Sequence, residues 1–183
     1  MLDWIDVDLQ HQALTLRRGQ DALLRFAVSS AAAGWGERHG SGCTPRGWHR
    51  IRLKIGAGCA ADAVFVARRA TGERYSQALA RAHPQRDWIL GRILWLTGTE
   101  PGRNRGGAVD TLRRFIYIHG TPDTSSLGHP CSHGCIRMHP QHLLHLFDRV
   151  TTGMAVCVRP PGVPLTAPGV SDPGRHNPVA SGS

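Results

Sequence analysis

The segments Ile118-His119-Gly120-Thr121 and Ser132-His133-Gly134-Cys135-Ile136-Arg137-Met138 decide how this chain is interpreted. The first ends an apolar, β-rich run, and the second lies just before residues with helical spacing that begin at Pro140. Loops between a strand and a helix hold their side chains on rigid supports, where functional groups are commonly placed. The pattern therefore predicts a strand–loop–helix unit with a thiol and imidazoles at its centre.

The rest of the chain is predicted to be mainly β-structure. Apolar alternation and β-rich composition favour strands at residues 2–9, 13–17, 22–29, 51–55, 63–67, 88–96, 115–118 and 154–158. The Gly-rich residues 34–47 are predicted to form a loop. One helix is expected from Pro140 towards Gly153, and a short one at residues 74–83. Many short strands with one firm helix indicate a mostly β domain.

The 183 residues suit one domain, expected at residues 1–159, followed by a Pro-rich flexible tail at residues 160–183. That tail holds six of the 12 prolines and almost no large apolar side chain, so it cannot bury enough surface to order itself. The sequence shows no apolar run of membrane-spanning length. Because the acidic start does not resemble a secretory signal, we expect a cytoplasmic protein, or a periplasmic one if the chain is a truncated form.

The net charge of +9 admits two classes of partner. A basic domain suits nucleic acid, and it equally suits an enzyme with an anionic substrate. Aromatic residues make up only 6% of the chain and do not alternate with basic ones, as they do in single-strand binders. A nucleic-acid-binding module is therefore kept as a remote alternative, and no nucleic-acid partner is expected.

Five cysteines are scattered along the chain, which argues against a disulfide framework and leaves at least one thiol free in a monomer. Cys131, His133 and Cys135, together with His119, His129 or His139, could supply four ligands for a structural zinc ion. Their spacing does not match the usual knuckles with two-residue gaps, so neither a metal nor another cofactor is expected. The simplest alternative is an ordinary surface loop before a helix, whose histidines are exposed and have no catalytic or metal-binding role.

A thiol nucleophile is the third interpretation of the same loop. Cys135 follows Gly134, which allows a sharp turn and leaves space beside the sulfur. The backbone N–H groups of Gly134 and Cys135 are candidates for binding an oxyanion. His119, at the end of a predicted strand, is the candidate base that takes the thiol proton and returns it to a leaving amine.

These residues resemble the catalytic motif of the YkuD-type L,D-transpeptidases, in an unexported bacterial form. Weaker blocks agree in the same order, among them Thr44-Pro45-Arg46-Gly47-Trp48 and the run at 88–96, so that the resemblance covers about residues 22–159. It combines a Ser-His-Gly-Cys motif with an upstream His-Gly, which is more specific than a single short pattern. The resemblance implies an L,D-transpeptidase-like β-sandwich or barrel with one or two short helices.

The resemblance also implies roles for individual residues. Cys135 would be the nucleophile and His119 the base, with the carbonyl of Gly120 orienting its ring. Ser132 and His133 would shape the site, with His133 near the oxyanion hole that the N–H groups of Gly134 and Cys135 form. Arg137 would contact a substrate carboxylate, although a surface salt bridge is an equally good interpretation.

The family's chemistry is acyl transfer on peptidoglycan tetrapeptide stems. The thiolate attacks the L-centre carbonyl of residue 3, terminal D-alanine leaves, and a thioester remains on the cysteine. An amine acceptor gives L,D-transpeptidation or exchange of D-amino acids, whereas water gives an L,D-carboxypeptidase. For an unexported chain we favour water, with soluble recycled muropeptides as substrates. The oligomeric state is left open.

Overall fold

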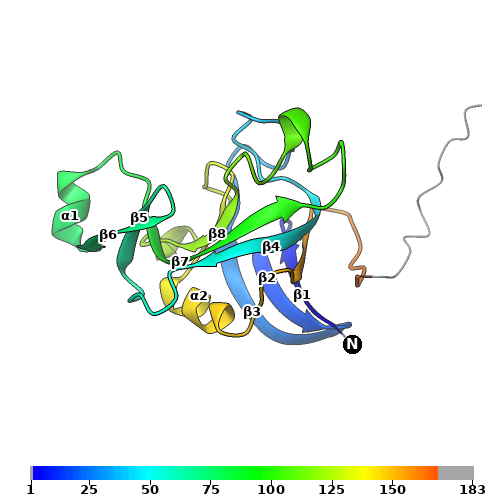
Figure 1. Cartoon of the computed structure of the whole chain (residues 1–183), viewed down its shortest axis with the longest axis horizontal. Coiled ribbons are helices and arrows are strands. Elements are labelled where there is room, and N and C mark those ends of the chain that lie inside the picture. The colour runs from blue at the N-terminus through cyan, green and yellow to red at the C-terminus, as the bar shows by residue number, and fades with distance from the viewer. Residues whose placement is uncertain (1, 169–183) are drawn as a thin grey trace, which may run out of the picture.

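A computed structural model describes residues 2–168 of the chain (Figure 1). Its strands are β1 (Asp3–Asp8), β2 (Ala13–Arg18), β3 (Asp21–Ser29), β4 (Gly47–Ile55), β5 (Ala63–Val66), β6 (Arg69–Arg74), β7 (Ile89–Gly98), β8 (Tyr117–Gly120), β9 (Ile136–Met138) and β10 (Ala155–Arg159). The helices are α1 (Gln77–Ala82) and α2 (Pro140–Phe147), and single 3-10 turns occur at Gly107–Val109 and Thr124–Ser126. The predicted mostly β class with short helices is confirmed.

Eight of these strands close into a barrel. Their order is β4-β10-β1-β2-β3-β9-β8-β7, and the pairing of β7 with β4 closes the ring. The pairs β1/β10 and β8/β9 are parallel, whereas the other neighbours in the ring are antiparallel. The hairpin β5–β6 pairs with β7 outside the ring and forms, with α1, the lobe at the left of Figure 1.

The barrel interior holds the main hydrophobic core. Side chains alternate across a strand, so every second residue points inward. Ile118 of β8 and Ile136 and Met138 of β9 are fully buried in this core. Helix α2 adds Leu143, Leu146 and Phe147 to it, which its 3.6-residue period places on one face.

A second, smaller core lies on the outer face of the sheet, where the β5–β6 hairpin meets it. It consists of Phe65, Ile93 and Tyr117, with Trp95 and Cys135 packed against them. Because residues at alternate positions of β7 and β8 point away from the barrel interior, this outer face collects the other half of their side chains. The predicted nucleophile therefore sits in a satellite core outside the barrel.

The predicted elements match the observed ones with a few differences. The helix predicted from Pro140 towards Gly153 ends already at Phe147. Asp148 is its C-terminal cap, and Val150 reaches the core from the turn that follows. The short predicted helix begins only after Ser76, whose side chain accepts a hydrogen bond from the Leu79 N–H. Strands β6 and β9 were not predicted, and Phe115 lies in a turn rather than in a strand.

The described part of the predicted tail, residues 160–168, contacts the barrel. Arg159 donates to the carbonyl of Val163 at 2.7 Å, and the N–H of Gly162 donates to Oε1 of Gln10 at 3.4 Å. Residues 169–183 lie outside the described residues, so flexibility of the tail stays a prediction. Within residues 2–168, neither helix has the length and apolar character needed to cross a membrane.

Candidate active site

The parallel pairing of β8 with β9 brings the two predicted catalytic residues to one face of the sheet. His119 lies opposite Arg137 in the register, and Ile118 lies opposite Ile136. Since side chains alternate, Tyr117, His119 and Arg137 share the outer face, and Cys135, one residue before β9, continues that face. Residues 16 positions apart in the sequence thus become neighbours on adjacent strands.

His119 is buried, with 1% of its surface exposed. Its Nδ1 lies 2.9 Å from the carbonyl oxygen of Gly120. Because a carbonyl can only accept, Nδ1 carries the hydrogen and Nε2 keeps a lone pair. Burial lowers the pKa of His119, against the opposing effect of the Gly120 hydrogen bond. The imidazole is therefore neutral and able to take a proton at Nε2.

Gly120 is needed for close packing as well as for its carbonyl. A Cβ at this position would lie 2.5 Å from the carbonyl oxygen of Leu90 on β7 and 3.3 Å from Cα of Pro140. Only glycine lets β8 approach β7 and the start of α2 this closely. The packing of three elements thereby fixes the carbonyl that orients His119.

The sulfur of Cys135 is held between two backbone groups. The N–H of Tyr117 donates to Sγ at 3.3 Å, and Sγ lies 3.4 Å from the carbonyl oxygen of Phe115, which accepts the thiol hydrogen. Burial raises the pKa of Cys135 to about 11, although the Tyr117 N–H and the charges of Arg137 and Arg114 oppose the shift. The resting thiol is therefore protonated and needs a base to become a nucleophile.

Ser132 organises the turn that leads into Cys135. Its Oγ donates to the Cys135 carbonyl at 2.5 Å and accepts from the Gly134 N–H at 3.2 Å. Gly134 has φ +135°, and a Cβ there would lie 3.4 Å from the Cys43 carbonyl. The Gly134 N–H thus already has a partner, and the oxyanion role predicted for it requires Ser132 to share that hydrogen. The role stays a prediction.

His133 is exposed and stands between two clefts. One cleft, of about 290 Å³, is bounded by residues 84–88, by residues 121–123, by His133 and by Arg137. The other, of about 340 Å³, is lined by His39, Gly40, Gly42, Arg114, Ile116 and His133. A bound molecule in either cleft would lie against the predicted catalytic loop.

Arg137 combines both interpretations that the sequence left open. Its Nη2 donates to Oδ1 of Asp87 at 2.9 Å, so it does form a salt bridge. It also lines the smaller cleft, and its buried Nε has no hydrogen-bond partner. A group with an unused donor at the wall of a cleft can bind a substrate carboxylate once Asp87 is displaced.

Two residues of the site were missed by the sequence analysis. Thr44 is fully buried, and its Oγ1 accepts from the Ala31 N–H at 3.0 Å and donates to the Gly134 carbonyl at 2.9 Å. Arg114 donates to the carbonyls of Glu37 and Cys43 at 2.8 and 2.6 Å. Thr44 ties the Gly-rich loop to the catalytic loop, and Arg114 ties the Gly-rich loop to the segment before β8, but no sequence motif marks contacts between such distant residues.

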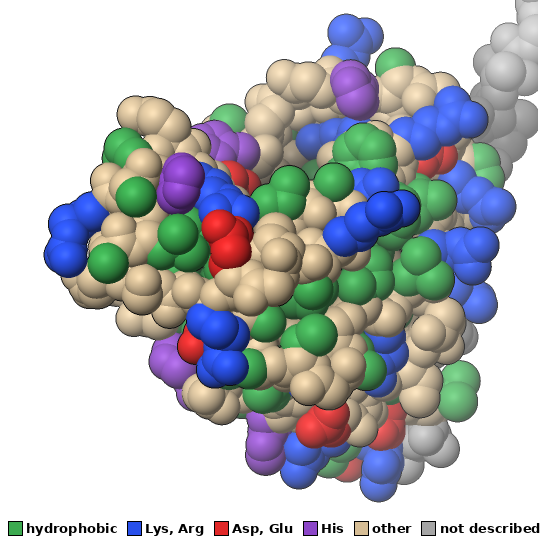
Figure 2. Space-filling view, turned by 60° about the vertical axis from the view of Figure 1, so that its left-hand side comes forward, with side chains coloured by type: hydrophobic (Ala, Val, Ile, Leu, Met, Phe, Trp, Pro, Cys, Tyr) green, Lys and Arg blue, Asp and Glu red, His purple; other side chains and the backbone are tan. Residues whose placement is uncertain are grey.

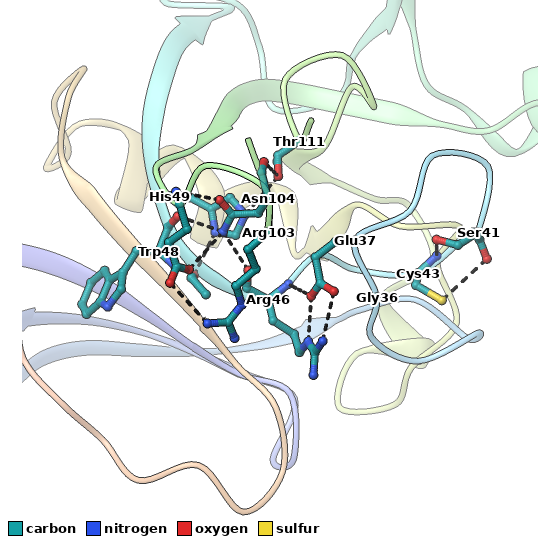
Figure 3. A network of polar contacts seen from close by, with 12 residues as sticks. Gly36, Glu37, Ser41, Cys43, Arg46, Trp48, His49, Arg103, Asn104 and Thr111 are labelled. Atoms are coloured by element: carbon teal, nitrogen blue, oxygen red, sulfur yellow. Dashed lines mark hydrogen bonds and ion pairs between the residues drawn. The ribbon is translucent and has the colours of Figure 1, made fainter. Parts of the chain in front are cut away.

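A polar network holds the far end of the same Gly-rich loop (Figure 3). Arg46 pairs with Glu37 through two side-chain hydrogen bonds, at 2.7 and 3.0 Å. The Asn104 side chain donates to the Arg46 carbonyl at 2.9 Å, and the buried His49 lies 3.2 Å from Oγ1 of Thr111. The long loop is thus fixed by side chains rather than by regular secondary structure.

The residues considered for zinc are engaged separately. Nδ1 of His139 caps α2 by accepting from the Gln141 N–H, Nδ1 of His119 donates to Gly120, and Sγ of Cys131 lies 3.0 Å from Oγ of Ser29. Within residues 2–168, no group of three or more His, Cys, Asp or Glu side chains is arranged to hold a metal. All five cysteines are free thiols, and burial raises the pKa of Cys157 on β10 to about 12.

Comparison with known proteins agrees with this arrangement. YqjB of Bacillus subtilis is 41% identical over 51 residues, which are 28% of this chain and 29% of that protein. YkuD of Bacillus licheniformis is 46% identical over 61 residues, 33% of this chain and 37% of that protein. The matched stretches therefore span little more than a third of these relatives at most.

Solved structures show the same fold. An L,D-transpeptidase from Mycobacterium smegmatis gives a TM-score of 0.53 at 19% identity, covering 86% of this chain and 58% of that one. The C442S mutant of the Enterococcus faecium L,D-transpeptidase gives 0.52 at 18% identity, covering 87% and 50%. The family model for the L,D-transpeptidase catalytic domain, YkuD, matches residues 2–158. With nearly the whole barrel and the loop around Cys135 inside that match, the chain belongs to the YkuD family of L,D-transpeptidase catalytic domains.

Proposed function

We propose that this chain transfers acyl groups from peptidoglycan tetrapeptide stems through a thioester on Cys135. The observation that carries the proposal is the presence of a protonated, partly buried thiol and a neutral, buried imidazole on the same face of adjacent strands. His119 presents Nε2 as a base because Gly120 accepts from Nδ1. Membership of the family supports peptidoglycan as the substrate class.

The first half of the reaction makes the thioester. Nε2 of His119 takes the thiol proton as Sγ of Cys135 attacks the carbonyl carbon of the third stem residue. The carbonyl oxygen becomes an oxyanion, for which the backbone N–H of Cys135 is the proposed donor. When the intermediate collapses, the C–N bond breaks, and the amine of D-alanine leaves with the proton held by His119.

The second half regenerates the thiol. His119 removes a proton from water, the hydroxide attacks the thioester, and the C–S bond breaks as His119 returns the proton to sulfur. Water needs no binding cleft of its own and no residue beyond those of the first half. We therefore propose L,D-carboxypeptidase activity on soluble tetrapeptide muropeptides, whose acidic stems suit the net charge of +9.

One observation favours an amine acceptor as a second candidate. Two clefts meet at His133, with volumes of about 290 and 340 Å³. A donor stem in one cleft and a D-amino acid in the other would give exchange, whereas the amine of a second stem in that place would give a cross-link. The same catalytic residues serve both outcomes, so the acceptor is decided by which molecule reaches the thioester.

The test is incubation with a disaccharide tetrapeptide, with and without a D-amino acid or a second stem, followed by mass analysis of the products. Loss of one alanine in water supports the carboxypeptidase, whereas exchange or dimer products support the transferase. Cys135→Ser and His119→Asn are expected to abolish both, while Cys43→Ser, a matched change at another free thiol, leaves them intact. Full activity of Cys135→Ser would refute the proposal.

A further inference from the structure

Two turns with left-handed backbone border the outer core that contains Cys135. Among residues 2–168, the non-glycine residues with positive φ are Gln12, Ala67, Arg68 and Phe115. Ala67 (φ 45°) and Arg68 (φ 67°) form the two-residue turn of the β5–β6 hairpin, and Phe115 (φ 55°) precedes β8. Left-handed backbone costs such residues about 1–3 kcal/mol each, and this kind of strain clusters at functional sites.

The two turns place Arg68 on a platform of aromatic rings. The centre of its guanidinium lies 4.7 Å from the ring centroid of Trp95 and 4.8 Å from that of Phe115. Its Nη1 donates to the hydroxyl of Tyr117 at 3.1 Å. The rings also contact one another, with Trp95 5.9 Å from both Phe115 and Tyr117. The guanidinium is therefore held in one orientation.

This platform adjoins the sulfur of Cys135. Phe115 accepts the thiol hydrogen with its carbonyl, and Tyr117 donates its N–H to Sγ. Phe115 is 48% exposed, so the platform is open to solvent. Figure 2, with the β5–β6 lobe turned forward, shows hydrophobic side chains between scattered Lys and Arg side chains.

Arg68 keeps most of its donors free. In the part of the chain that the structure describes, no carboxylate pairs with Arg68, whereas Arg137 is paired with Asp87. With Nη1 on Tyr117, Nη2 and Nε remain for a bidentate carboxylate. Stacking on two rings means that little side-chain freedom is lost when such a ligand binds.

We propose that Arg68 binds the terminal carboxylate of the stem peptide, the carboxylate of the residue that leaves. This inference rests on the proposed function. In a peptide that loses its last residue, the terminal carboxylate lies within about 5 Å of the attacked carbonyl carbon. A cation that recognises it must therefore stand near the nucleophile, and Arg68 is bonded to the side chain of Tyr117, the residue whose N–H contacts Sγ. The two strained turns hold Arg68 and the Cys135 thiol in a fixed position relative to each other.

The test compares a tetrapeptide muropeptide with the same molecule amidated at its C-terminus. The wild type is expected to prefer the free acid in kcat/KM, and Arg68→Met is expected to lower that preference about 10- to 100-fold by slowing the acid and not the amide. Methionine keeps an apolar stem on the rings, so folding is preserved. The matched control is Arg69→Met, which removes the same charge from an adjacent exposed position and should leave the preference unchanged.

Binding to the Cys135→Ser variant separates this inference from the proposed function. If the wild type releases no D-alanine, the proposed function fails, but the acid should still bind this variant more tightly than the amide. Adding Arg68→Met should abolish that difference. An unchanged acid-to-amide ratio in Arg68→Met, in turnover or in binding, overturns the role of Arg68 whatever the reaction proves to be.

Discussion

Burial sets the protonation state of the two side chains that carry the proposed chemistry. It lowers the pKa of His119 and raises that of Cys135 to about 11, so that neither is charged at neutral pH. A neutral pair avoids placing an ion pair in the small outer core, where desolvation would be costly. The proposed reaction therefore begins with transfer of the Cys135 proton to His119.

The rate of alkylation of Cys135 should report the protonation state of its thiol directly. In the free enzyme, the rate of iodoacetamide labelling at Cys135 is expected to rise about tenfold per pH unit from pH 7 to 10, because only the thiolate reacts. Peptide mapping would separate Cys135 from Cys157, whose pKa of about 12 makes it slower still. A rate that levels off near neutral pH would show that Cys135 is a stable thiolate.

A second buried histidine, His49, makes the stability of the fold depend on pH. Burial lowers the pKa of His49 from 6.5 to about 4. The unfolded chain therefore binds this proton first, so the contribution of His49 is complete above pH 6.5 and is lost as the pH falls towards 4. We expect the free energy of unfolding in urea to fall over that range, and His49→Asn to flatten the slope. An unchanged slope would contradict a neutral buried His49.

Among the structural elements, the catalytic loop depends on the Gly-rich loop at residues 34–47. Thr44 bonds the Ala31 N–H and the Gly134 carbonyl, and Arg114 bonds several carbonyls of the same loop. The backbone contributes as well, because isolated bridges join Ala31 to Ser132 and Trp35 to Thr44. Side chains from distant parts of the chain therefore help to fix the position of the loop that carries Cys135.

Thr44→Val tests this dependence. The change keeps the shape but leaves two buried backbone groups without a partner, which should cost about 2 kcal/mol of unfolding free energy. Displacement of the catalytic loop should lower kcat by at least about tenfold. Thr44→Ser, which retains the hydroxyl, is the control for both urea unfolding and turnover. Wild-type turnover in Thr44→Val would show that the catalytic loop holds its own geometry.

Single elements differ in how well sequence patterns revealed them. Strands with clear alternation, such as residues 51–55 within β4, were predicted correctly. Strand β9 has only three residues, and Ile136, Arg137 and Met138 show too little alternation to be recognised. Strand β6, Arg69–Arg74, is largely polar and exposed, because it lies at the edge of the sheet and packs little.

At the scale of the whole molecule, the first and last strands of the domain lie side by side in the barrel wall. Strands β1 and β10 pair in parallel, and Arg159 of β10 binds Asp6 at 3.0 Å and Asp8 at 2.8 Å on β1. The Asp6 side chain is only 2% exposed. Its charge is therefore nearly buried and depends on its arginine partners.

Arg159→Met should weaken the pairing of β1 with β10 and lower the stability of the fold. The variant removes one of the two arginines that balance the buried charge of Asp6. We expect the free energy of unfolding in urea to fall by on the order of 3 kcal/mol. This is the low end for a buried ion pair, because Arg17 still lies 3.5 Å from Asp6. The control, Arg18→Met, breaks a more exposed pair with Asp3, which joins β1 to its other neighbour β2, and should cost far less. Equal losses in both variants would contradict a special role for Arg159.

The sequence by itself determined the β-rich class, most strand positions, the Gly-rich loop, and His119 and Cys135 as the candidate pair, because these follow from local periodicity and from residue types with distinctive chemistry. The tertiary structure alone decided the closure of the barrel, the outer core around Cys135, and the contacts of Thr44, Arg114 and Arg68. Those features join residues far apart in the chain. No local pattern encodes such distances, and burial, which sets the protonation of the site, exists only once the strands are packed.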